Sequence, residues 1–283
     1  MIHSMRAAAR AGCLQARAEL RIAFLTRNSI GLLCLGPLFL LFLALNEWNG
    51  LDSELVPNSA FALVSALGSI GLLGAAEIMG EMFREHNDGS FLRMRILPRG
   101  TESWMFGKVL SFSVVNGFIL VVVMSVGLLL FPDLRPASLT DFLVLAASLV
   151  LSLVVLFPVG VALGSLVHST LSLLVCLCLL CMLFFGAGTV SPISVFPKPL
   201  QWVTASTPIY WGAHAARSAV LPPELGSVEI SGSFQPLIAF VVLTAWAVAG
   251  YIAAPRILRR SIRRETMGSV AAAREKIVSR GCA

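Results

Sequence analysis

Ionisable side chains gather at the end of one long apolar stretch, where they could carry charge or transmit motion. Glu77, Glu81 and Glu85 follow one another at intervals of four residues, and a helix therefore places them on one face with Arg84 beside Glu81. A carboxylate inside a membrane costs about 2.5 to 3.5 kcal/mol, a cost that such partners offset. The pattern predicts either a solvated helix end stiffened by ion pairs or a hinge that transmits motion from the residues that follow.

Those following residues, 86–98, combine apolar and charged side chains in a short segment. Gly89 is expected to break the helix line, and Pro98 is expected to end the segment. Phe91 and Leu92 offer apolar contact, while Arg93 and Arg95 offer charged hydrogen bonds. This composition is suited to a small protein interface.

Known catalytic patterns are absent from the sequence. The four histidines are scattered, and no HExxH motif occurs. Gly100 to Lys108 only approximates a phosphate-binding loop, because the spacing of its glycines is too long and Val109 replaces the Ser or Thr that binds Mg²⁺. The cysteines at 176, 178 and 181 lie in an apolar stretch without His or carboxylate neighbours, which favours packing over metal binding. We expect no ATP site, cofactor or metal on this chain.

The composition is that of an integral membrane protein, since 57% of the residues are hydrophobic and only 13% are charged. A bilayer core is spanned by about 20 apolar residues in a helix. The long apolar runs show no strand alternation, so we predict an all-α bundle forming a single domain over 1–283. Its six predicted transmembrane helices cover about 29–46, 60–81, 107–131, 142–165, 170–189 and 236–254.

The positive charges follow the membrane and do not suggest nucleic acid binding. Of the 21 Lys and Arg residues, all but Arg135, Lys198 and Arg217 precede the first span, separate spans two and three, or follow the last span. By the positive-inside rule, both termini then lie in the cytoplasm. An alanine- and arginine-rich chain of this kind suggests a bacterial cytoplasmic membrane as its location.

Two further segments are expected to lie at the membrane surfaces. Residues 4–26 carry four arginines on one helical face, which predicts an interfacial helix on anionic lipid, or else a solvated helix docked on a partner. Residues 190–235 mix aromatic residues with prolines. They are too apolar for a free loop and too broken for a span, so we expect short re-entrant or interfacial helices, or a plain anchoring hairpin.

The order of residues after span two resembles a known family. Glu81, Arg84, Glu85, Gly89, Leu92, Arg93 and Pro98 resemble the signature of ABC-2 type permeases, the membrane subunits of ATP-driven exporters of the daunorubicin-resistance and nodulation-factor type. Lys108 at the start of span three is similar to the family pattern as well. So is the outer segment with Ser191, Pro197, Trp202, Pro208 and Arg217.

The resemblance implies that 86–98 is a coupling helix that docks on a separate ATPase, which would bind the ATP and Mg²⁺. It also implies a dimer with a second permease copy or homologue, exporting an amphipathic drug or antibiotic, a lipid or a polysaccharide. Two other classes stay open on the residues alone. An ion-coupled secondary transporter would need ionisable groups near the bilayer midplane, and a lipid-modifying enzyme would need polar residues grouped at one depth.

Overall fold

The computed structural model describes residues 2–25, 59–91, 100–131, 135–189 and 192–264, and all regular structure in these ranges is helical. Three helices are long and apolar enough to cross a membrane: α6 (Gly100–Leu130), α7 (Leu139–Gly164) and α11 (Pro236–Arg264). A fourth span is formed if α3 (Ser59–Gly68) and α4 (Gly71–Asp88), which meet at an angle of 43°, are counted as one. The chain is therefore a multi-pass membrane protein.

The prediction of six spans is supported only in part. Helices coincide with the predicted spans 60–81, 107–131, 142–165 and 236–254, although the first of these is bent rather than continuous. The predicted fifth span corresponds to α8 (Thr170–Gly186), an apolar helix of 17 residues that is shorter than a full span. The predicted span 29–46 lies outside the described residues. Within the described residues, the structure thus supports three or four spans.

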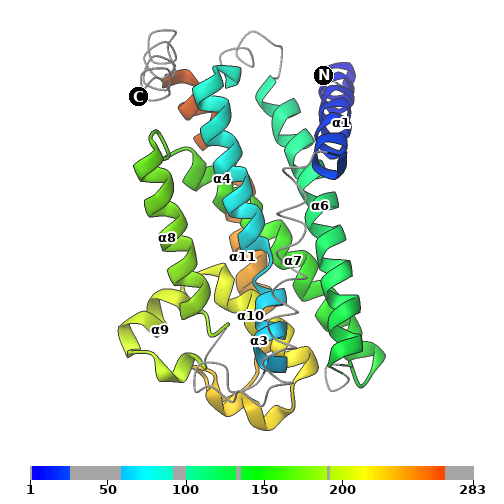
Figure 1. Cartoon of the computed structure of the whole chain (residues 1–283), viewed down its shortest axis with the longest axis vertical. Coiled ribbons are helices and arrows are strands. Elements are labelled where there is room, and N and C mark those ends of the chain that lie inside the picture. The colour runs from blue at the N-terminus through cyan, green and yellow to red at the C-terminus, as the bar shows by residue number, and fades with distance from the viewer. Residues whose placement is uncertain (1, 26–58, 92–99, 132–134, 190–191, 265–283) are drawn as a thin grey trace.

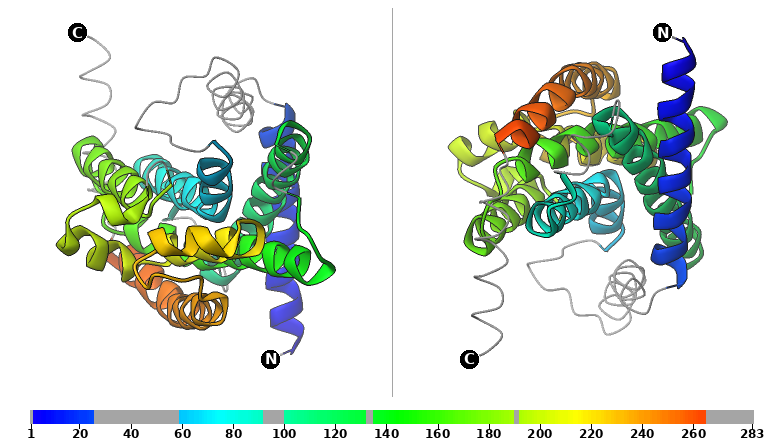
Figure 2. Two further views of the ribbon diagram at one scale, coloured as in Figure 1. Left: turned by 90° about the horizontal axis from the view of Figure 1, so that it is seen from below. Right: turned by 90° about the horizontal axis from the view of Figure 1, so that it is seen from above.

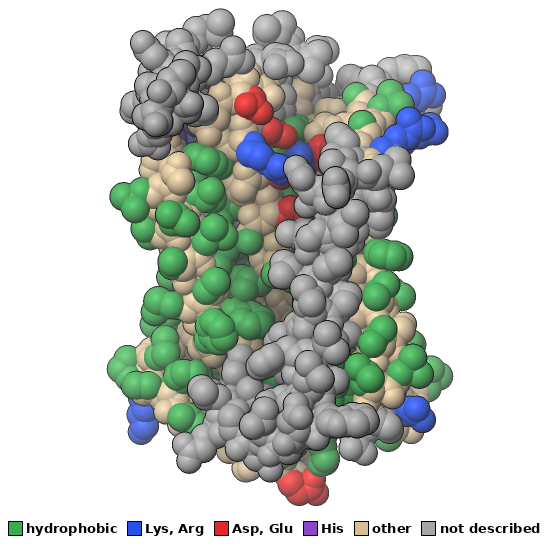
Figure 3. Space-filling model, in the orientation of Figure 1, with side chains coloured by type: hydrophobic (Ala, Val, Ile, Leu, Met, Phe, Trp, Pro, Cys, Tyr) green, Lys and Arg blue, Asp and Glu red, His purple; other side chains and the backbone are tan. Residues whose placement is uncertain are grey.

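The long helices run side by side, and α7 lies at the centre (Figure 1). It packs against α4, α10 and α11, while α8 packs on the outer side of α4. At one end of the bundle lie α1 (Ile2–Leu25), the end of α4 and the start of α6 (Figure 1). Figure 3 shows hydrophobic side chains over the middle of one face and charged side chains toward its two ends, the distribution expected in a bilayer.

Helix α1 confirms the predicted N-terminal helix. It crosses the end of the bundle over α6, transverse to the long helices (Figure 2). Gly12 and Ala16 face α6, whereas Arg10, Arg17 and Arg21 are exposed. This orientation suits a helix lying on a membrane surface, which stays a prediction.

The stretch between α8 and α11 folds into short helices, as expected for residues 190–235. They are η2 (Ile193–Val195), α9 (Lys198–Ala205), α10 (Pro208–Val220) and η3 (Pro223–Val228). Pro208 occupies the first turn of α10, where its missing N–H is harmless. Helix α9 is largely exposed, with Trp202 76% accessible, whereas α10 is buried between α3, α7 and α11. The segment is thus partly an exposed hairpin and partly an internal helix.

Small residues allow the helices to approach closely. An added Cβ on Gly160 would meet the backbone of Ala75 at 2.7 Å, and one on Gly164 would meet the side chain of Met82 at 2.6 Å. The GxxxG pair of α7 therefore forms its contact with α4. On α3, an added Cβ at Gly68 would lie 2.5 Å from the carbonyl oxygen of Gly212 in α10.

The contact between Gly68 and Gly212 predicts an unequal response to alanine in the same span. Gly68→Ala forces a methyl group against a backbone oxygen that cannot rotate away, and we expect it to destabilise the fold by about 1 to 3 kcal/mol. Gly80→Ala is the matched control, since its added Cβ meets nothing within 4 Å. Thermal unfolding in detergent measures both variants. An equal effect of the two would contradict the proposed crossing.

Candidate functional site

The buried ammonium of Lys108 joins three helices at the α1 end of the bundle. Its Nζ lies 2.8 Å from Oε1 of Glu19 in α1 and 3.4 Å from Oε1 of Glu85 in α4, and it also bonds to Oε2 of Glu81. Arg84 adds a bond of 3.2 Å to Glu81. We call these five residues the Lys108 cluster. The single positive charge of Lys108, in a position of low dielectric constant, thus holds three carboxylates.

Neutral side chains complete the cluster. Ser111 Oγ donates to Glu19 Oε2 at 2.6 Å, and Gln15 Nε2 donates to Glu19 Oε1 at 2.9 Å. Burial alone would raise the pKa of Glu19, but the ammonium of Lys108 and these two hydrogen bonds outweigh it and lower the pKa. Glu19 is therefore held ionised, and α1 is tied to α6 by a charged contact as well as by packing.

The predicted hinge residues are thus brought together, with one exception. The Lys108 cluster contains Glu81, Arg84 and Glu85. Glu77 lies one turn before Glu81 on α4, and its Oε2 is 3.4 Å from Nδ2 of Asn116 in α6. The sequence indicated the pair of Glu81 and Arg84, which the structure confirms. The sequence did not indicate that Glu19 and Lys108 belong to this cluster, although a lysine inside an apolar helix requires a partner.

The predicted docking segment begins as expected but is described only in part. Gly89 ends α4 in the left-handed conformation, with φ of 71°, and its N–H bonds to the carbonyl oxygens of Glu85 and His86. The ring of Phe91 is 1% exposed and packs edge-on against Trp104 of α6 at 6.1 Å. Phe91 is therefore buried against α6, and the docking role predicted for it stays a prediction. Leu92, Arg93, Arg95 and Pro98 lie outside the described residues.

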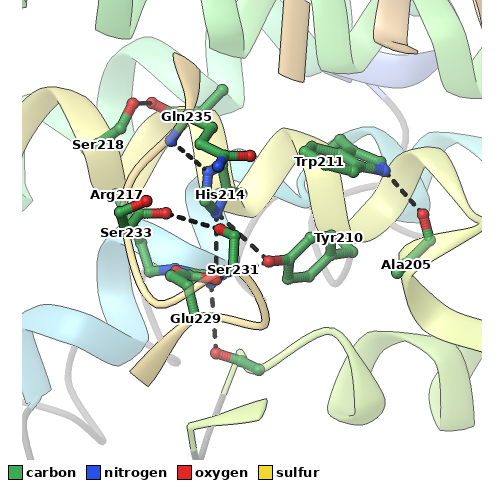
Figure 4. A network of polar contacts seen from close by, with 12 residues as sticks. Ala205, Tyr210, Trp211, His214, Arg217, Ser218, Glu229, Ser231, Ser233 and Gln235 are labelled. Atoms are coloured by element: carbon green, nitrogen blue, oxygen red, sulfur yellow. Dashed lines mark hydrogen bonds and ion pairs between the residues drawn. The ribbon is translucent and has the colours of Figure 1, made fainter. Parts of the chain in front are cut away.

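At the other end of the bundle, Arg217 of α10 is 1% exposed and forms hydrogen bonds through all three of its guanidinium nitrogens (Figure 4). Its Nε donates to Glu229 Oε1 at 2.6 Å and its Nη2 donates to Glu229 Oε2 at 3.1 Å. Nη1 donates to Ser65 Oγ of α3 at 3.0 Å and contacts the carbonyl oxygen of Gly188 at 3.4 Å. The two-pronged pairing with a carboxylate is the geometry that a guanidinium favours.

Tyr210 and His214, which lie two turns and one turn before Arg217 on α10, share the same carboxylate. Tyr210 Oη donates to Glu229 Oε2 at 2.9 Å, and His214 Nδ1 lies 3.1 Å from that oxygen. The N–H of Gln235 at the start of α11 donates to His214 Nε2 at 2.9 Å, which leaves Nδ1 to carry the ring proton. We call Tyr210, His214, Arg217 and Glu229 the Arg217 network.

The network keeps Glu229 ionised. Burial alone would raise the pKa of Glu229, but Arg217 and His214 outweigh it and lower the pKa to about 2. Burial and the charge of Glu229 raise the pKa of Tyr210, which therefore stays a hydrogen-bond donor. Arg217 was expected from the sequence, and its partners were not. A buried arginine in this segment required an acid, and only Glu224 and Glu229 were available between 190 and 235.

The other outer residues have structural positions. Pro197 precedes α9, Trp202 projects from α9 into the surroundings, and Pro208 begins α10. Ser191 lies outside the described residues. No group of three or more His, Cys, Asp or Glu side chains able to hold a metal occurs in the ranges that the structure describes.

A multi-pass helical protein whose charges gather at the two ends of its bundle has the form of an integral membrane domain. Residues 45–249, well over half of the chain, match the family described as ABC-2 family transporter protein. The chain therefore belongs to this family and is a membrane subunit of an ABC-2 type transporter. A comparison with curated proteins gave no match.

The Arg217 network predicts a loss of stability on removal of its carboxylate. Glu229→Gln leaves Arg217 buried without a counter-ion, and we expect a destabilisation of about 3 to 5 kcal/mol. Because the folded pKa lies below the ordinary 4.5, the contribution of Glu229 is complete above about pH 5 and is lost as the pH falls toward 2. Unfolding in detergent between pH 3 and 7 measures this. Glu224→Gln, on an exposed side chain, should leave the whole curve unchanged.

The Lys108 cluster predicts a looser α1 when its acid is removed. Glu19→Gln loses the charged bond to Lys108, and we expect hydrogen–deuterium exchange of the α1 amides to become about tenfold faster. Arg17→Gln, on the exposed side of the same helix, is the control and should exchange at the wild-type rate. Equal exchange of Glu19→Gln and wild type would show that packing alone holds α1.

Proposed function

We propose that this chain is the transmembrane subunit of an ATP-driven exporter that moves an amphipathic drug or antibiotic, a lipid or a polysaccharide out of the cell. Membership of the ABC-2 transporter family carries the proposal. The residue order after span two further supports the daunorubicin-resistance and nodulation-factor type. Two copies, or one copy with a homologue, would enclose the path, because a bundle of this size encloses little space by itself.

Energy for export would come from a separate ATPase subunit. The sequence contains no intact phosphate-binding loop, since Gly100 to Lys108 lacks both the glycine spacing and the Ser or Thr that Mg²⁺ requires. ATP and Mg²⁺ would therefore bind to the partner. The permease would supply the docking surface and the path.

The docking surface would be residues 86–98. Support comes from the end of α4, where Gly89 ends the helix and Phe91 packs against Trp104 of α6. Glu81 and Glu85 lie one to two turns earlier and are bound to Lys108. A push on the docking surface would thus reach α4, α6 and α1 together, which is the behaviour expected of a transmission hinge.

The proposed orientation places this end in the cytoplasm. The positive-inside rule requires it for the sequence, and α1, the end of α4 and the end of α11 share one end of the bundle (Figure 1). Lys198 and Arg217 lie on the α9 and α10 segments at the other end. A soluble ATPase could then reach the docking surface, and α9 with α10 would face outward.

Charge reversal in the docking surface tests this function. Arg93→Glu should leave membrane insertion intact and abolish the ATP hydrolysis that the permease stimulates in reconstituted vesicles, because a docking arginine would meet its carboxylate partner with the wrong charge. Arg135→Glu, on the opposite side of the membrane, is the matched control.

Co-purification separates this function from its alternatives. An ATPase encoded nearby should extract together with the wild-type chain and should be lost with Arg93→Glu. Unchanged hydrolysis with Arg93→Glu would remove residues 86–98 from the docking role. Transport by the chain alone would replace the exporter with a secondary transporter.

A further inference from the structure

One histidine ring contacts both ends of the loop that leads into α11. This loop, 229–235, has an exposed middle over residues 230–233, and Glu229 and Gln235 form its two ends (Figure 4). Nδ1 of His214 lies 3.1 Å from Oε2 of Glu229, and the N–H of Gln235 donates to Nε2 of His214 at 2.9 Å. A side chain of α10 thus holds the loop at its beginning and at its end.

The two ends of the 229–235 loop are held unequally. Glu229 also accepts from the hydroxyl of Tyr210 and from two guanidinium nitrogens of Arg217, so several bonds keep this end in place. Among the described residues, the N–H of Gln235 has a single hydrogen bond, the one to Nε2 of His214. This bond is therefore the polar contact that ties the start of α11 to α10.

The bond to Gln235 requires a neutral ring. A ring nitrogen accepts a hydrogen bond through its lone pair, so Nε2 of His214 carries no proton and the ring proton is on Nδ1. The histidine cation carries a proton on both nitrogens and has no acceptor. Charging His214 therefore turns two hydrogens against each other and breaks the bond to Gln235. The bond to Glu229 is kept and strengthened, because its donor is then charged.

The surroundings of His214 both oppose and favour its charging. The ring is fully buried and lies against the aromatic rings of Trp211 and Phe234, which disfavours a charge. The carboxylate at 3.1 Å favours it. Helix α3 contains no charged residue, and neither α7 nor α11 brings a charged side chain into contact with the ring within the described residues. The described charged or titratable side chains that face the ring are Tyr210, Arg217 and Glu229.

We propose that His214 is an acid-sensitive switch: when neutral it holds both ends of the 229–235 loop, and when charged it keeps Glu229 and releases Gln235 with the start of α11. Histidine is the side chain that ordinarily gains its charge between pH 8 and pH 5. In the proposed orientation this end of the bundle faces outward, so acid outside the cell would act on the switch. That orientation rests on the proposed function, whereas the switch itself rests on the contacts of His214.

The release is expected to stay local. Further along α11, the ring of Tyr251 stacks on Phe157 of α7 at 6.3 Å between centroids, and an added Cβ on Gly250 would meet the ring of Pro158 at 2.6 Å. These contacts contain no group that titrates with histidine. Acid therefore loosens the first turn of α11 and leaves its packing on α7 in place.

Hydrogen–deuterium exchange of the full chain in lipid nanodiscs, without ATPase or ATP, tests the switch. The protection of each amide is its intrinsic exchange rate divided by its observed rate at the same pH, which removes the pH dependence of exchange itself. Between pH 8 and pH 5.5, wild type should lose about 3- to 10-fold of the protection at Gln235 and in the first turn of α11, the value of one neutral hydrogen bond. The amides of α7 should stay protected.

Two variants assign the effect to this ring. His214→Gln keeps both bonds without titrating, because its amide oxygen accepts from Gln235 and its amide nitrogen donates to Glu229. It should show protection close to that of wild type at pH 8 and no loss at pH 5.5. His168→Gln, on an exposed histidine at the opposite end of the bundle, is the matched control and should keep the loss seen in wild type.

A second measurement leaves residue 214 unchanged and applies even where His214→Gln does not fold. Replacing the other three histidines, in a chain with His3→Gln, His86→Gln and His168→Gln, leaves a single histidine. NMR of its isotope-labelled ring nitrogens shows which of the two carries a proton. Nε2 should be unprotonated at pH 8 and protonated at pH 5.5.

Unchanged protection at Gln235 in wild type, a loss that persists in His214→Gln, or an Nε2 that stays unprotonated at pH 5.5 would each overturn the switch. So would an equal loss of protection in α7, because acid would then unfold the whole bundle. Failure of the Arg93→Glu test would remove the docking role of residues 86–98 and would leave these outcomes unchanged.

Discussion

The guanidinium of Arg217 is the constraint on which the end of the bundle around α10 depends. A charge removed from water is stable only with a well-placed counter-ion and with its remaining donors satisfied. Glu229 supplies the counter-ion, and Ser65 and Gly188 accept from the third nitrogen. These partners come from α3, from the turn after α8 and from the turn after η3, so satisfying one side chain fixes the relative positions of all three around α10. His214 extends the same requirement to the start of α11 through the N–H of Gln235.

The α1 end of the bundle is held by the same principle, again around a buried cation. There one buried ammonium, Lys108, gathers carboxylates from α1 and α4 around α6. Between the two charged centres, span two is held by apolar contact and by close approach of small residues. Span two also bends in this region, between Gly68 and Gly71. There Ser152 of α7 donates to the carbonyl oxygen of Gly68. The two charged centres thus lie at the two ends of a bundle whose second span is bent between them.

The sequence predicted the features that depend on neighbouring residues. Apolar runs located the helices from α6 to α8 and α11, and the i, i+3 spacing of Glu81 and Arg84 predicted their ion pair. The sequence did not predict contacts between residues that lie far apart in the chain. Glu19 is paired with a lysine in α6, and a serine of α7 donates to the carbonyl oxygen of Gly68 at the bend in span two. Neither contact leaves a periodic signal in the sequence. Gly68 and Gly71 indicated tight packing, but small residues serve straight and bent helices equally well. For Arg217, the sequence could predict only that some acid must pair with it, because nothing in the spacing distinguishes Glu229 from Glu224.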